Sequence, residues 1–241
     1  MNVTDFRRVY VWQLPVRIFH WMNALAIVVL ATSGYLIAKP PAILLSVEAS
    51  QSYWFGVIRA THFITAYIFL AVMLLRLYYA FFAGNRYANW RAFVPFNKRG
   101  RGNIAYVLKH DILLFRDKNP DCRNLSIGHN AVAAISYLVM FFMALVMLFT
   151  GFGLYADNSG WFLPKLFGWV PAMLGGDFAT RTIHHISMWI FLAFIVVHVY
   201  LVLFHDWLEG RGETSSMISG YKYVSRERLE IHQKEELKEV A

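Results

Sequence analysis

Residues 183–204 read IHHISMWIFLAFIVVHVYLVLF, and this run decides the fold class. It contains no Asp, Glu, Lys or Arg, and roughly 20 apolar residues suffice for a helix to cross a bilayer. Residues 18–38, 60–83 and 131–155 form three further apolar runs of similar length. The sequence therefore predicts an all-α membrane protein: a four-helix transmembrane bundle that makes one domain over residues 1–241, with a hydrophilic tail at 205–241. A soluble enzyme and a disordered chain are excluded as first interpretations.

Charge is scarce and unevenly distributed. Charged residues make up 16% of the chain and its net charge is +8, whereas an average soluble domain is about a quarter charged. Eighteen Lys and Arg residues lie in the N-terminal segment, the connection 84–130 and the tail, against four in the other two connections. The positive-inside rule predicts that both termini and the middle connection are cytoplasmic. The basic residues thus follow the topology, and we expect membrane lipid and no nucleic acid as a partner.

The cysteine content limits the cofactors that the chain can bind. Cys122 is the only cysteine, so an intramolecular disulfide and a cysteine-ligated iron–sulfur cluster are excluded. No Cys-x-x-Cys-His motif occurs, which excludes a covalently attached c-type haem.

Five histidines lie in or at the predicted spans: His20, His62, His184, His185 and His198. An ionisable side chain inside a membrane is costly and indicates function. The spacing of His184 and His198 on one helix separates them by about 21 Å and keeps them within about 40° of one face. His185 is about 140° away from His198 around the helix, so its role stays open.

The predicted topology orders four of these histidines by depth. The first helix runs outward and begins near His20, whereas the second and fourth run inward. His62 and His184 then form an outer pair, and His20 and His198 an inner pair. Two such pairs match the axial ligands of two b haems in a four-helix bundle. The spans contain no Asp or Glu, which disfavours proton or metal transport, but a haem-free, histidine-lined transporter and a passive anchor remain alternatives.

Three other residues are candidate haem contacts. Gly34 follows His20 by the same number of residues that separates His184 from His198, so it is predicted to lie at the level of the outer haem. A missing side chain there would give a porphyrin room to approach. The alternative is that Gly34 only allows two helices to pack closely. Arg76 follows His62 at the same spacing, so it can pair with a propionate of the inner haem, unless it snorkels to the interface. Arg17, just before His20, is the third.

Residues 128–130, Gly-His-Asn, precede the third helix on the predicted cytoplasmic side. A quinone needs hydrogen-bond donors for its carbonyls and a proton source after reduction, and His129 and Asn130 offer both. We therefore consider Gly128, His129 and Asn130 a candidate quinone site. The alternative is that Asn130 only caps the helix.

Several stretches resemble a known family, the b-type cytochrome subunits of membrane-bound uptake NiFe hydrogenases. They are residues 17–21 (RIFHW) running to 32–34 (TSG), 181–189 (RTIHHISMW) running to His198, 127–130 (IGHN), 84–87 (GNRY) and 219–221 (SGY). The resemblance covers about residues 8–223 and includes all four proposed ligands. One departure is Ser33, where the family usually has Thr.

The resemblance implies a location in the bacterial inner membrane and a more specific function than spacing does. Such subunits accept electrons from the iron–sulfur small subunit of a hydrogenase on the outer face, pass them through two haem b groups, and reduce quinone near the cytoplasm. The hydrogen chemistry belongs to the small and large subunits, which the cytochrome also anchors. The cytochrome b subunits of formate dehydrogenases are more distant relatives and remain an alternative.

Overall fold

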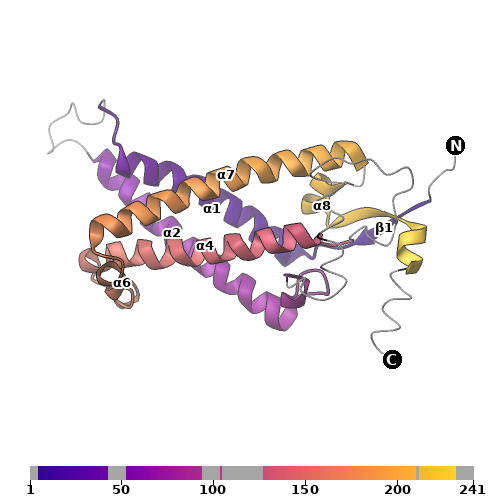
Figure 1. Cartoon of the computed structure of the whole chain (residues 1–241), viewed down its shortest axis with the longest axis horizontal. Coiled ribbons are helices and arrows are strands. Elements are labelled where there is room, and N and C mark those ends of the chain that lie inside the picture. The colour runs from indigo at the N-terminus through magenta and orange to yellow at the C-terminus, as the bar shows by residue number, and fades with distance from the viewer. Residues whose placement is uncertain (1–4, 43–52, 94–103, 105–126, 210–211, 232–241) are drawn as a thin grey trace. The chain divides into compact units, whose positions relative to one another are not determined.

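Four long helices dominate the computed structural model, which describes residues 5–42, 53–93, 104, 127–209 and 212–231. They are α1 (Leu14–Ala38), α2 (Trp54–Tyr78), α4 (Ala131–Tyr155) and α7 (Asp177–Glu209) (Figure 1). Four helical segments are long and apolar enough to cross a membrane, and they coincide with the four predicted runs. The prediction of four membrane-spanning helices is thus confirmed at the level of length and composition.

Three of these helices begin earlier than the apolar runs suggest. α1 starts at Leu14 rather than at 18, α2 at Trp54 rather than at 60, and α7 at Asp177 rather than at 183. Hydropathy marks only the apolar part of a helix, whereas the backbone hydrogen bonds continue through mixed polar and aromatic turns. At its other end α2 continues as a π-helical segment, η3 (Tyr79–Ala83), which stops at Gly84.

The chain divides into two compact units. The first, here called the helical unit, is drawn from residues 18–77 and 140–197. The second, the terminal unit, is drawn from residues 1–17, 78–139 and 198–241.

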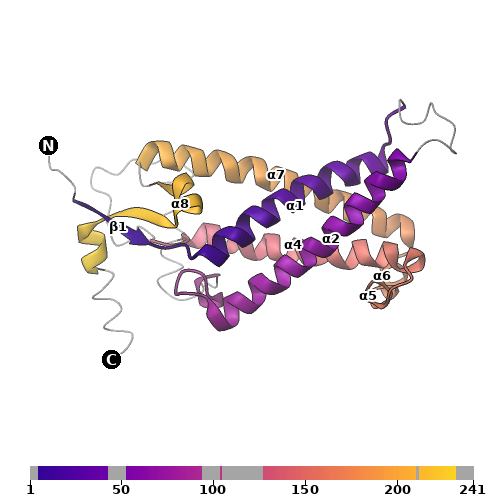
Figure 2. The same ribbon diagram turned by 180° about the vertical axis from the view of Figure 1, so that it is seen from behind.

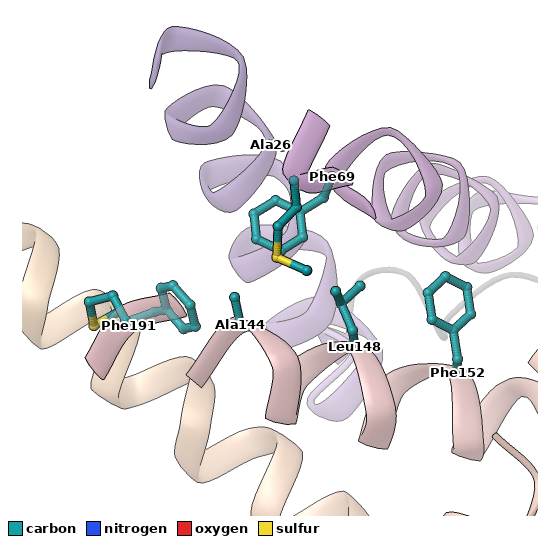
Figure 3. Close-up of a cluster of buried hydrophobic side chains, with 8 residues drawn as sticks. Ala26, Phe69, Ala144, Leu148, Phe152 and Phe191 are labelled. Carbon is teal, nitrogen blue, oxygen red and sulfur yellow. The ribbon is translucent and has the colours of Figure 1, made fainter. Parts of the chain in front are cut away.

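An apolar core holds the helical unit together. Ala144, Leu148 and Phe152 recur every fourth residue along α4, so they share one side of that helix. Figure 3 shows them directed toward Phe69 of α2 and Ala26 of α1. Met73, Met140 and Phe191 complete this buried cluster. A helix buries such a side when it packs among other helices, which agrees with the predicted bundle.

The connection between α4 and α7 also belongs to the helical unit. It contains η7 (Ala156–Asn158), α5 (Phe162–Lys165) and α6 (Trp169–Met173) (Figure 2). The Phe167 ring lies 5.0 Å from the ring of Phe149 and 5.7 Å from that of Phe152, centroid to centroid. The connection is therefore packed back onto the end of α4.

A two-stranded ribbon organises the terminal unit. β1 (Phe6–Tyr10) pairs antiparallel with β2 (Tyr221–Ser225), so that Phe6 lies opposite Ser225 and Tyr10 opposite Tyr221. The short helix α8 (Glu213–Ser219) precedes β2 (Figure 1). The expectation of an all-α protein is wrong here, and the hydrophilic tail contains ordered structure. Strands this short show little alternation in sequence, and their partners lie at opposite ends of the chain.

The terminal unit has its own core. Val11, Trp12 and Val16 pack with Ala88, Ile127 and Val224, and the short 3-10 helix η4 (Trp90–Phe93) follows Ala88. The Lys222 side chain is buried, and its Nζ lies 2.5 Å from Oε2 of Glu213. The N-terminal segment, the described ends of the middle connection and the tail thus pack together. These are the three segments that the charge pattern assigns to one side of the membrane.

Candidate functional site

His62 of α2 and His184 of α7 both lie in the helical unit. His185 is next to His184 in the same helix. The two candidates for the predicted outer pair therefore come from two different helices of one unit, and their pairing across a haem stays a prediction.

A hydroxyl from a third helix contacts His62. Ser33 of α1 places its Oγ 3.0 Å from Nδ1 of His62. The same Oγ lies 2.6 Å from the carbonyl oxygen of Val29, one turn earlier in α1. A serine hydroxyl has one proton, and the carbonyl can only accept it. Ser33 Oγ therefore accepts a hydrogen bond from Nδ1–H of His62.

A hydroxyl from another helix also contacts His184. Thr150 of α4 places its Oγ1 2.8 Å from Nδ1 of His184, and it donates to the carbonyl oxygen of Val146 at 2.7 Å. The hydroxyl proton of Thr150 is therefore already donated to a carbonyl oxygen of α4. His184 accordingly donates from Nδ1–H to Thr150.

A glycine follows each hydroxyl residue and makes room for the ring. A Cβ atom on Gly34 would lie 3.2 Å from Cε1 of His62, and one on Gly151 would lie 3.1 Å from Cε1 of His184. Both distances are shorter than ordinary van der Waals contact. The expected role of Gly34 at the outer level is thus refined: its nearest neighbour is an axial-ligand candidate, His62.

These contacts allow a test of whether the outer pair fits a haem. Haem iron binds the unprotonated nitrogen of a neutral imidazole. The hydroxyl contacts put the proton on Nδ1 of both rings and leave Nε2 as the ligand nitrogen. Histidine ligands of metals regularly donate their other N–H in this way. The residues present therefore fit a bis-histidine haem site.

The sequence analysis missed Ser33, Thr150 and Gly151 as site residues. A signal was available: a hydroxyl residue followed by glycine occurs in the first and third spans, as Ser33-Gly34 and Thr150-Gly151. Spacing alone does not show which histidine each pair meets, because that depends on how the helices pack.

The candidates for the inner pair lie on the expected helices. His20 is in α1, where its ring is 5.1 Å from that of Trp21 in an edge-to-face arrangement. His198 is in α7, in the same unbroken helix as His184. His20 belongs to the helical unit and His198 to the terminal unit, so their pairing stays a prediction.

An aromatic cluster surrounds His129 in the terminal unit. Its ring centroid lies 4.6 Å from Trp12, 4.8 Å from Tyr137 and 5.2 Å from Phe93. Tyr137 in turn contacts the ring of His198 at 6.4 Å. The candidate quinone residue is therefore linked by aromatic contacts to a candidate ligand of the inner haem.

The two neighbours of His129 have structural roles. Oδ1 of Asn130 accepts a hydrogen bond from the backbone N–H of Ala133 at 2.7 Å, so Asn130 caps α4. A Cβ on Gly128 would lie 2.9 Å from Cδ1 of Tyr87, so this glycine makes room for the Tyr87 ring. His129 is the member of the triplet whose ring lies in the aromatic cluster.

The two arginine candidates lie in α1 and α2. Nη1 of Arg17 donates a hydrogen bond to the carbonyl oxygen of Ile218, which ties the start of α1 to α8. Arg76 lies in the last turn of α2, in the same helix as His62. Contact of either side chain with a haem stays a prediction.

Known proteins resemble this chain over most of its length. Residues 11–220 match the family model described as prokaryotic cytochrome b561. A "Probable Ni/Fe-hydrogenase B-type cytochrome subunit" from Cupriavidus necator is 37% identical over 222 residues, which is 90% of this chain and 88% of the relative. Proteins with the same name from Rhodobacter capsulatus and, as the hydrogenase 1 subunit, from Escherichia coli K12 are each 33% identical and cover 92% and 88% of this chain.

These two relatives are matched over 84% and 90% of their own lengths. The four apolar helices and the four candidate ligand histidines lie within the matched residues. The chain therefore belongs to the prokaryotic cytochrome b561 family.

Proposed function

We propose that this chain is the membrane cytochrome b subunit of a hydrogen:quinone oxidoreductase. It accepts electrons from the iron–sulfur small subunit of a Ni/Fe-hydrogenase at the outer face and delivers them to quinone at the cytoplasmic face. It also anchors the hydrogenase, including the large subunit that performs the hydrogen chemistry. The observation that carries the proposal is that His62 and His184 each place Nδ1 within hydrogen-bond distance of a buried hydroxyl from another helix.

Each group in the chain has a defined task. His62 and His184 bind the outer haem b, and His20 and His198 bind the inner one. When bound, the two haems supply one-electron carriers at two depths. His129 binds a quinone carbonyl within its aromatic cluster and supplies a proton. Arg17, Gly34 and Arg76 contact the haems, and Gly128 and Asn130 shape the quinone site.

The names of the relatives support a hydrogenase as the partner. The charge pattern supports electron transfer from the outer face to the cytoplasmic face. When one electron moves inward across the membrane, each 100 mV of membrane potential changes the free energy of the transfer by about 2.3 kcal/mol. If cytoplasmic protons complete the quinol, turnover contributes to that potential.

Haem content tests the ligand assignment. The full chain, purified from membranes, is expected to contain two haem b per polypeptide by reduced-minus-oxidised spectra and haem extraction. His62→Ala and His184→Ala should each leave one haem, as should His20→Ala and His198→Ala. His185→Ala is the matched control, because it removes a neighbouring imidazole outside the proposed ligand set, and it should keep two.

Other results would support the alternatives. A haem-free protein that conducts ions in liposomes would indicate the histidine-lined transporter and contradict the proposal. In intact membranes hydrogen should reduce the haems, whereas reduction by formate alone would assign the chain to a formate dehydrogenase-type complex. Unchanged quinone reduction after loss of all four ligands would indicate a passive anchor.

The quinone assignment has its own test. His129→Ala removes the imidazole from the cluster of Trp12, Phe93 and Tyr137, so hydrogen-dependent quinone reduction should fall at least about tenfold. Both haems should remain and should still be reduced by hydrogen. If quinone reduction persists at the wild-type rate with both haems present, the quinone binds elsewhere.

A further inference from the structure

Ser33 and Thr150 form a matched pair around the outer histidines. Ser33 is 6% exposed and Thr150 is 2% exposed, so water does not compete for either hydroxyl. Each one donates to the carbonyl four residues earlier and accepts from Nδ1 of one histidine. Each hydroxyl comes from a different helix than the histidine it contacts. Ser33 of α1 contacts His62 of α2, and Thr150 of α4 contacts His184 of α7.

The glycine beside each hydroxyl makes the contact specific. With a side chain at Gly34 or Gly151, the ring would have to move by a few tenths of an ångström. Hydroxyl and glycine therefore act together: one holds the Nδ1 side of the ring, and the other lets the Cε1 side approach the neighbouring helix. The ring orientation is defined from two sides.

We propose that Ser33 and Thr150 are positioning residues that fix the tautomer and orientation of the two outer axial histidines and lower the reduction potential of the outer haem. This inference rests on the proposed ligation of that haem by His62 and His184. An N–H that donates a hydrogen bond makes the opposite ring nitrogen a stronger electron donor. Stronger donation stabilises the ferric more than the ferrous state, so the potential falls.

The test uses hydroxyl deletions in the full-length protein with its haems. Ser33→Ala and Thr150→Ala should each raise the midpoint potential of the outer haem, and the double variant should raise it further. The low-spin ferric EPR signal of that haem should also shift, because its shape depends on the orientation and basicity of the axial rings. The outer haem is identified as the one that His62→Ala loses.

Matched controls separate this effect from general damage to the helices. Thr32 precedes Ser33 and donates the same kind of bond, to the carbonyl oxygen of Val28 at 2.8 Å. Ser136 does so in α4, to Val132 at 2.9 Å. Thr32→Ala and Ser136→Ala should therefore leave the potential and the EPR signal of the outer haem unchanged. Ser33→Thr and Thr150→Ser keep the hydroxyls and should behave like the wild type.

Each outcome supports or overturns the inference. The inference is supported if the midpoint potential rises and the EPR signal shifts in Ser33→Ala and Thr150→Ala but not in Thr32→Ala and Ser136→Ala. It is overturned if the potential and the EPR signal of the outer haem are the same in all four variants. If Ser33→Ala loses the outer haem, retention in Ser33→Thr supports the inference and loss in both contradicts it. If His62→Ala retains both haems, the ligand assignment fails instead, so the two failures are distinguishable.

Discussion

At the scale of single residues, the glycines beside the outer histidines show how an absent side chain shapes a site. Gly34 and Gly151 lie in helices, where glycine usually costs stability relative to alanine. Here a Cβ would press on Cε1 of His62 or His184. Glycine at these two positions therefore leaves room for the close approach of the rings.

Adding one methyl group at these positions should weaken haem binding. Gly34→Ala and Gly151→Ala push the rings away from the hydroxyls that orient them, so we expect the outer haem to be retained about tenfold more weakly. Haem loss to an excess of a haem-scavenging apoprotein measures this. Gly56→Ala is the matched control in α2, since nothing lies within 4 Å of its Cβ. Equal retention in all three variants would contradict the steric role.

At the scale of elements, the β1–β2 ribbon depends on the turn at its base. Gly220 has a φ of 87°, in the left-handed region that favours glycine. Its carbonyl oxygen accepts hydrogen bonds from the backbone N–H groups of Val11 and Trp12 at 2.9 and 3.0 Å. One glycine therefore joins the end of α8 to the segment that leads into α1.

Replacing this glycine should detach the ribbon. A Cβ on Gly220 would lie 2.6 Å from Cε2 of Tyr10 and 2.7 Å from the backbone oxygen of Trp12. Gly220→Ala should lower the free energy of unfolding of the terminal unit by about 1–3 kcal/mol. Limited proteolysis of the N-terminal segment, compared with Gly160→Ala, measures the effect. Gly160 has open space around its Cβ, so that variant should be cleaved at the wild-type rate.

At the scale of the whole molecule, the charge asymmetry predicts how the chain lies in the membrane. The ribbon pairs residues near the N-terminus with residues of the tail, so both ends of the helix set share one unit. An even number of spans likewise places both chain ends on one side of the membrane. The basic segments of that unit are expected to be retained in the cytoplasm.

Reporter fusions test this orientation. A fluorescent protein fused to the tail should fluoresce, because it folds in the cytoplasm. Alkaline phosphatase inserted after Asn158, in the connection between α4 and α7, should be active because it is exported. The two reporters exchanged between these positions are the control and should both be silent. An active phosphatase on the tail would reverse the predicted direction of electron transfer.

Much of the architecture was predictable because it depends on local regularities of the chain. Helix rise and twist convert a separation along the sequence into depth and direction, so His184 and His198 could be assigned to two levels of one helix. The apolar runs located the four helices, and the distribution of Lys and Arg predicts the direction in which each one crosses the membrane. Span positions and helix periodicity can be derived without knowing which helices are neighbours.

Only the tertiary structure decided which side chains meet. The partners Ser33 with His62 and Thr150 with His184 come from helices distant in sequence, and residues 6–10 pair with residues 221–225. Such contacts arise from interhelical packing and strand pairing, whose energy depends on shape between segments rather than on any pattern within one. The sequence by itself determined the spans and the candidate ligands, and interhelical packing decided which hydroxyl contacts His62 and which contacts His184.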